Sequence, residues 1–220
     1  DDIGLAGPNV VEATEVVAST PAMRAYVDTL VERSDRIRGG VDPREDNMLM
    51  VCNDGRKAAL DLEMVGVYDS GAGKVGRVVD RVAATWRAHQ GREYLDARGE
   101  PSGRRGALQI VFCDLGTPQP GDSQVYGKIR RGLIAAGVPG DEIRFVHDAR
   151  TDAAKAALFS ECRSGRVSVL MGSTEKLGMG TNVQHRCVAI HHVNAPWRPA
   201  DVEQRTGRGN RPGNQNDTLD

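Results

Sequence analysis

The regular alternation of short apolar runs with amphipathic segments after residue 74 most constrains how this chain can fold. Four apolar runs have the length of a strand, and they span residues 108–113, 142–147, 167–171 and 187–193. Helix-like segments lie before and between them, at 75–90, 125–136 and 152–163. Nearly continuous apolar runs are typical of strands that are covered on both faces. The spacing predicts right-handed βαβ units, and therefore an α/β fold with a doubly wound parallel sheet and helices on both faces.

The residues before position 74 lack this alternation. A helix is predicted from Pro21 to Arg38, and Gly39 and Gly40 end it. Two short strands are predicted, at 14–18 and 48–52. The glycine cluster Gly71-Ala72-Gly73 is typical of a linker. We therefore predict a mostly helical N-terminal extension at 1–73 and the main domain at 74–220.

Two glycine-containing segments are interpreted as connections. The string Gly71-Ala72-Gly73-Lys74 is not a Walker A loop, because that motif requires glycine at position 68 and serine or threonine at position 75. The chain has Tyr68 and Val75 there. The second segment, Gly91–Gly106, is polar and carries several arginines, and we predict that it is a mobile connection.

Composition excludes several classes of function. The chain has 220 residues and a formal net charge of −1, so nucleic-acid binding requires a local basic patch. The 4 cysteines form no C-x-x-C pair, which favours reduced thiols in a cytoplasmic protein over disulfides or zinc. The histidines form no convincing metal-ligand set, no apolar run approaches the ~20 residues of a membrane span, and no signal peptide opens the chain. Because the first residue is Asp, we interpret the sequence as a segment of a longer protein.

The stretch Asp201–Arg211 is the strongest candidate for chemistry. Gln204, Arg208 and Arg211 are spaced at i, i+4 and i+7, and on a helix they fall within roughly 60° of one another. A guanidinium group stays charged and can donate to two phosphate oxygens at once, so this array suits a polyphosphate. Glycines within the stretch weaken a helix, which places the last arginine on a loop after a short helix. The alternative is a solvated basic helix end.

Three strings resemble motifs of one family. Gln204–Arg211 resembles motif VI of superfamily two helicases, the Q/H-R-x-G-R-x-x-R box. Ser173–Gln184 is similar to motif V of the same family, and Asn194–Pro199 resembles the Trp-Asn-Pro segment of Swi/Snf-type translocases. The likeness runs from about Asn47 to Asn216. It is strongest to the helicase part of phage and plasmid proteins that join a DNA methylase to a Swi/Snf-like helicase.

The resemblance implies that 74–220 is the second RecA-like lobe of a helicase, and it assigns one set of residues to the nucleotide. Arg208 and Arg211 would reach the γ-phosphate of ATP held, with Mg²⁺, by a first lobe. Gln204 would help to sense that phosphate. Gly180 and Asn182 match positions near the nucleotide and the interface between the lobes. No resident metal is expected on this lobe.

A second set is assigned to nucleic acid. The resemblance places Thr174 at the nucleic-acid backbone, and we add Ser173, Lys176 and Arg198 as candidate contacts. Ligands of open parallel sheets bind beyond the carboxyl ends of the strands, where these residues lie. Ordinary capping of the next helix by Ser173 or Thr174 is the alternative. Asp114 resembles the end of motif IV, and capping is equally open for it.

Trp197 lies between Pro196 and Pro199, and its ring can be interpreted in two ways. Burial against the helix before Arg208 is favoured over stacking on a base.

The predicted function is therefore the C-terminal lobe of an ATP-dependent DNA helicase or translocase. Its expected partners are DNA, the first lobe and, as in the resembling proteins, a fused DNA methylase domain. The isolated segment should be inactive. The alternative is a non-catalytic nucleic-acid-binding or regulatory module. A Rossmann-type enzyme is disfavoured, because Asp114–Pro118 does not supply a G-x-G-x-x-G loop.

Overall fold

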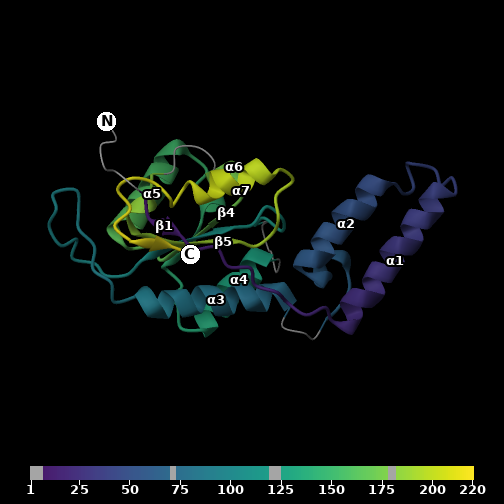
Figure 1. Cartoon of the computed structure of the whole chain (residues 1–220), viewed down its shortest axis with the longest axis horizontal. Coiled ribbons are helices and arrows are strands. Elements are labelled where there is room, and N and C mark those ends of the chain that lie inside the picture. The colour runs from purple at the N-terminus through teal and green to yellow at the C-terminus, as the bar shows by residue number, and fades with distance from the viewer. Residues whose placement is uncertain (1–6, 70–72, 119–124, 178–181) are drawn as a thin grey trace. The chain divides into compact units, whose positions relative to one another are not determined.

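The computed structural model describes residues 7–69, 73–118, 125–177 and 182–220 (Figure 1). The chain forms two compact units. The smaller comprises Glu15–Arg77, and the larger comprises the residues up to Thr14 together with Val78–Asp220.

A four-stranded parallel sheet forms the centre of the larger unit. Its strands are β2 (Leu108–Phe112), β3 (Ile143–Phe145), β4 (Val169–Gly172) and β5 (Cys187–His192), in the order β3-β4-β2-β5. The predicted runs contain these strands, except that β4 extends one residue further. Phe112 is in register with both Gly172 and His192, so three strands end at one level. This common end places the segments after β2, β4 and β5 beside one another.

Helices cover both faces of the sheet, as predicted for an α/β fold. They are α3 (Gly73–His89), α4 (Val125–Ala135), α5 (Asp152–Ser164), α6 (Thr174–Leu177) and α7 (Pro199–Thr206). In Figure 1, α5, α6 and α7 lie on one side of the strands, and α3 and α4 lie on the other. Leu108, Ile110 and Phe112 pack in one core cluster with Leu158 and Phe159 of α5. The side chain of Gln109 points to the opposite face and donates to the Val82 carbonyl of α3 at 3.1 Å.

The two ends of the described chain form a separate two-stranded sheet beside β5. β1 (Asn9–Val10) pairs in parallel with β6 (Thr218–Leu219). The Asp220 N–H donates to the Val188 carbonyl at 2.9 Å, which joins this pair to β5. This pairing explains why the residues up to Thr14 group with the larger unit. The strand predicted at 14–18 was wrong, because those residues have no regular structure.

The smaller unit is helical, as predicted for the N-terminal extension. It contains α1 (Pro21–Arg38), α2 (Met48–Leu60) and the 3₁₀ turn Leu62–Val65. Thr20 caps α1 by accepting from the Met23 N–H at 3.1 Å, and Asn47 caps α2 in the same way. The predicted strand at 48–52 was wrong, because the Asn47 cap begins a helix there.

The connection predicted to be mobile is anchored in the structure. The Tyr94 hydroxyl donates to Asn216 Oδ1 at 2.8 Å, and the Leu95 N–H donates to Gln215 Oε1 at 2.8 Å. Arg186, at 2% exposure, donates to the carbonyls of Arg104 and Gly106. These contacts join segments about 80 to 120 residues apart, so no local pattern predicts them. Among the described helices, none has the length and apolar character needed to cross a membrane.

Candidate functional site

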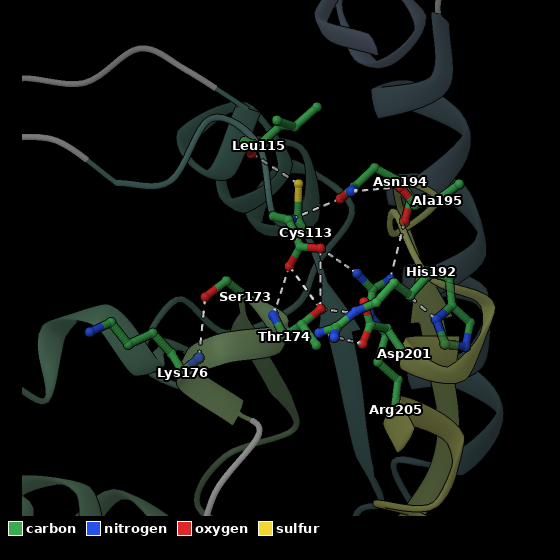
Figure 2. A network of polar contacts seen from close by, with 12 residues as sticks. Cys113, Leu115, Ser173, Thr174, Lys176, His192, Asn194, Ala195, Asp201 and Arg205 are labelled. Carbon is green, nitrogen blue, oxygen red and sulfur yellow. Dashed lines mark hydrogen bonds and ion pairs between the residues drawn. The ribbon is translucent and has the colours of Figure 1, made fainter. Parts of the chain in front are cut away.

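The carboxyl ends of β2, β4 and β5 bring three polar segments together. Asp114 follows β2, Ser173 and Thr174 follow β4, and Asn194 follows β5. Figure 2 shows Thr174, Asn194 and Arg205 in one network of polar contacts. Polar side chains beyond the strand ends therefore form one cluster, in the place where ligands of open parallel sheets bind.

Asp114 connects two of these segments. Its Oδ1 accepts from the Thr174 N–H at 2.7 Å and from the Thr174 hydroxyl at 2.9 Å. Its own N–H donates to Asn194 Oδ1 at 2.8 Å. A carboxylate that accepts the first N–H of a helix is a cap, so Asp114 fills the capping role for α6.

Arg205 of α7 is the hub of the network, and its side chain is 0% exposed. Its Nη2 lies 2.5 Å from Asp114 Oδ2, and its Nε donates to Thr174 Oγ1 at 2.8 Å. Its Nη1 donates to the Asn194 carbonyl at 3.1 Å, and its guanidinium lies over the ring of Phe112. The Asp114 side chain is 25% exposed, so only the guanidinium of this ion pair is fully buried. Removing the partner of a buried charge typically costs about 3–5 kcal/mol, because that charge stays buried without it.

His192 borders this cluster. Burial, and then the charge of Arg205, lower the pKa of His192 to about 4. Its Nδ1 lies 3.5 Å from Arg205 Nη1. The ring is therefore neutral at neutral pH, and it adds no second positive charge beside the buried guanidinium.

The two hydroxyls after β4 are both engaged within the chain. Ser173 Oγ accepts from the Lys176 N–H at 3.3 Å, so Ser173 caps α6, which was one of the two interpretations. The Thr174 hydroxyl proton points to the Asp114 carboxylate, and its oxygen accepts from Arg205. The Lys176 side chain lies on the exposed surface of α6.

Helix α7 is shorter than the predicted box and ends at Thr206, where Gly207 caps it. Arg208 lies in the turn that follows, and its N–H donates to the Arg205 carbonyl at 3.0 Å. Burial, and then the charge of Arg211, lower the pKa of Arg208. The positive charges of the two arginines therefore repel each other, although the two residues do not lie on one continuous helix. Gln204 is exposed on α7.

Gly209 fixes the position of that turn. A Cβ there would lie 2.8 Å from Leu219 Cδ1 and 3.1 Å from Cys187 Sγ. The backbone between Arg208 and Arg211 thus packs directly against the core, which only glycine allows.

The remaining predicted residues lie outside the network. Asn182 is exposed, and its carbonyl accepts from Arg163 Nη1 at 3.1 Å. Gly180 lies outside the described residues. Arg198 is exposed and lies 3.5 Å from Asp201. Trp197 is 65% exposed, so the burial that was favoured for it was wrong.

Arg205 is the central residue that sequence reasoning missed. It is part of the motif VI string, but spacing alone does not separate a buried arginine from an exposed one. The available signal was a spacing: Arg205 lies four residues after Asp201, which places the two side chains on one face of a short helix. In the structure, Arg205 is buried on the side of that helix next to the strand ends.

Comparison with known proteins adds distant likenesses to solved structures. No protein-family model matches the chain, and no curated protein matches it. Of solved structures, the C-terminal domain of the DEAD-box protein Dbp5 is 21% identical, with 51% of this chain and 59% of that chain covered and a TM-score of 0.37. The Hef helicase domain of Pyrococcus furiosus is 15% identical, with 89% and 34% covered and a TM-score of 0.39. The chain spans less than two thirds of either.

Proposed function

We propose that this chain is the C-terminal, RecA-like lobe of an ATP-dependent DNA helicase or translocase of the Swi/Snf-like type. One observation carries the proposal: the segments that resemble motifs V and VI meet at one edge of the sheet. They meet through the contact of Arg205 with Thr174 and Asp114. Two strings that are separated in the sequence are therefore neighbours in space, as a shared site requires.

The turn that carries Arg208, together with Arg211 after it, suits contact with a nucleotide phosphate held by a partner lobe. The positive charges of Arg208 and Arg211 repel each other, and an anion bound between them would offset that repulsion. Bound ATP supplies the γ-phosphoryl group for hydrolysis, with Mg²⁺ on the first lobe. Arg208 and Arg211 hold positive charge toward that group, a contribution of roughly 10³ to 10⁵ in rate for arginine fingers. Gln204 and Asn182, both exposed, complete the proposed nucleotide side, with Gly180 as a further candidate.

The strand-end residues fit a nucleic-acid backbone. Lys176 and Arg198 present exposed cations on segments that follow β4 and β5. The exposed ring of Trp197 is suited to stacking on a base. Ser173 and Thr174 are the proposed hydroxyl contacts. Thr174 has one hydroxyl proton, so a phosphate there would accept its hydrogen bond in place of Asp114.

These two sides imply a motor that needs both lobes. Closing and opening of the lobes with the nucleotide cycle would step the chain along DNA. By itself, this lobe neither binds ATP tightly nor hydrolyses it. The first lobe of the same protein is the required partner, and a fused methylase domain is a further proposed one.

A non-catalytic nucleic-acid-binding or regulatory module is the second candidate. The exposed Trp197 beside the exposed Arg198 favours it, because this pair suits single-stranded nucleic acid without any nucleotide.

An ATPase assay separates the two candidates. We expect this chain, joined to a first lobe with Walker A and DExx motifs, to hydrolyse ATP in a DNA-stimulated manner. Arg208→Ala should abolish that activity, while Arg131→Ala, which removes an exposed arginine from α4, should retain it. DNA binding without ATPase activity in the joined protein would favour the non-catalytic module.

A further inference from the structure

The segments that lead into β2, β4 and β5 meet at the amino edge of the sheet, where the strands begin, opposite the candidate site. Leu108 is in register with Cys187, and Gln109 is in register with Val169, so the three strands begin near one level. The segments are 102–106, 163–166 and 184–186, and together they contain five arginines and no aspartate or glutamate. In a chain whose formal net charge is −1, this edge concentrates positive charge.

The three segments pack together around the buried guanidinium of Arg186. Its Nε donates to the Arg163 carbonyl at 2.9 Å, and its Nη1 donates to the Arg104 carbonyl at 3.1 Å. A Cβ at Gly165 would overlap this Nη1 and would lie 3.4 Å from Cβ of Arg104. Arg104, Arg163 and Arg166 are exposed around this point. These three arginines, with Arg186 beneath them, form what we call the amino-edge patch.

The charge of the amino-edge patch is not neutralised within the described part of the chain. No carboxylate among the described residues forms an ion pair with any of its four arginines. Three carboxylates that are close to the patch in sequence are engaged by other groups: those of Glu93, Glu142 and Glu161 contact Arg105, Ser168 and Arg144, respectively. Because Arg186 is 2% exposed, solvent screens its charge little, and this charge adds to the positive potential of the surface above it.

The amino-edge patch suits a chain of phosphates better than a single small anion. Its exposed arginines stand on two separate segments, and each guanidinium can donate to two phosphate oxygens. The three segments contain no phenylalanine, tyrosine or tryptophan, and Tyr94, whose ring the guanidinium of Arg186 covers, is 2% exposed. The patch therefore offers none of these rings for stacking on an unpaired base, which favours the backbone of duplex DNA over a single strand.

We propose that the amino-edge patch is a further nucleic-acid site, which binds the phosphate backbone of duplex DNA without reading its sequence. The site goes beyond the proposed function, because it shares no residue with the contacts proposed at the carboxyl ends of the strands. It also requires neither a nucleotide nor a first lobe. A duplex held at this edge leaves the opposite edge of the sheet free for its own proposed contacts.

The salt dependence of duplex binding tests the proposal. Fluorescence anisotropy of a short labelled DNA duplex is measured with the full 220-residue chain over a range of salt concentrations. In the variant Arg104→Gln/Arg163→Gln/Arg166→Gln, the slope of log affinity against log salt concentration should decrease by about 3, since each lost phosphate contact removes about 1. Binding should weaken to the same extent for duplexes of different sequence.

A matched control removes the same charge from other parts of the surface. Arg24, Arg44 and Arg131 are exposed and stand on three separate segments, so Arg24→Gln/Arg44→Gln/Arg131→Gln should keep a slope close to that of the wild type. Equal losses of slope in the two triple variants would overturn the proposal, because binding would then depend on net charge and not on the patch.

A purely structural role for the patch predicts a different result. Arg163 lies in the last turn of α5 and Arg166 follows its cap, where cations also stabilise a helix through its dipole. If the arginines serve only this purpose, the triple variant of the patch will unfold at a lower temperature and keep the wild-type slope. That outcome would also overturn the proposal.

Arg166→Glu keeps the test decisive if the triple variant does not fold. The Arg166 side chain is exposed and forms no hydrogen bond or ion pair with the described residues, so the substitution removes no such internal contact. It should weaken duplex binding more than Arg131→Glu, which reverses a charge on α4. Equal affinities of these two variants would contradict the patch.

Lys176→Gln/Arg198→Gln tests the contacts proposed at the carboxyl ends of the strands separately. If this variant loses oligothymidylate binding while the patch variant binds duplex as the wild type does, the amino-edge site fails and the proposed function stands. If the patch variant loses duplex binding and keeps oligothymidylate binding, the amino-edge site is supported as a separate one. A wild-type chain that binds neither form of DNA would overturn both.

Discussion

The Nη2 atom of Arg205 lies 2.5 Å from Oδ2 of Asp114, although the two residues are 91 positions apart in the sequence. This ion pair joins helix α7 to the end of strand β2. It also fixes the start of α6, since the same carboxylate accepts from Thr174. Three segments that carry the proposed contacts are therefore held by one ion pair whose guanidinium is buried.

Asp114→Ala should destabilise the larger unit by about 3–5 kcal/mol, because it leaves the guanidinium of Arg205 buried without its anion. Urea unfolding followed by circular dichroism measures the loss. Glu93→Ala is the control, because it removes a carboxylate from an exposed pair with Arg105 and should cost at most about 1 kcal/mol. Equal losses in the two variants would contradict the buried pair as a main support of the site.

Gly209→Ala should cost about 1–3 kcal/mol, because the new methyl group would lie 2.8 Å from Leu219 Cδ1. It should also displace the turn that holds Arg208 and Arg211. Gly91→Ala is the matched control, because nothing lies within 4 Å of a Cβ at that position. Thermal unfolding of both variants measures the difference, and an unchanged midpoint in Gly209→Ala would contradict the close packing.

The sheet was predictable from the sequence, while the site was only partly so. The strands β2, β4 and β5 are local apolar runs, and periodicity alone finds them. Pairing of β1 with β6 joins the two ends of the described chain, and no local pattern carries that information. The run at 48–52 was assigned to a strand because it is short and apolar. It begins a helix instead, because the Asn47 side chain accepts from the Met50 N–H and caps it.

The motif strings predicted a candidate site but not its internal contacts. Arg208 and Arg211 were predicted as site residues because their guanidiniums follow Gln204 at regular spacing. Arg205 lies in the same string, and its burial depends on Asp114 and Thr174, which come from distant strands. Exposure of Trp197 depends likewise on how its loop follows β5. Tertiary contacts determine whether such side chains are buried or exposed, and the local sequence does not contain that information.

The stability of the larger unit should fall as the pH is lowered from the ordinary histidine range toward 4. Burial, and then the charges of Arg81 and His192, lower the pKa of His191 from 6.5 to about 4. The unfolded chain therefore binds this proton first, so the free energy of unfolding is highest above pH 6.5 and falls between these two values. His191→Gln should reduce the slope in urea titrations across this window. An identical slope in wild type and variant would contradict the lowered pKa.

Cys52 should be the only one of the 4 cysteines that reacts rapidly with a thiol reagent in the folded chain. It is exposed on α2, whereas Cys113, Cys162 and Cys187 are buried. Burial raises the pKa of Cys162 and of Cys187 to about 12, so neither forms the reactive thiolate at neutral pH. Mass spectrometry after brief alkylation should show one adduct in the wild type and none in Cys52→Ser. A second rapid adduct in the native chain would contradict the burial of the other three.

Trp197→Ala should weaken binding of a short oligothymidylate by roughly 5- to 140-fold. This range follows from a stacking contribution of about 1–3 kcal/mol per base, with about 1.4 kcal/mol for each tenfold change. The ring is 65% exposed at the carboxyl edge of the sheet, so its removal should change the unfolding midpoint little. Fluorescence anisotropy of a labelled oligonucleotide measures the affinity. Tyr68→Ala, which removes an 80% exposed ring from the smaller unit, is the control and should bind as the wild type does. Equal affinity in wild type and Trp197→Ala would assign the nucleic-acid contact to the cations and hydroxyls alone.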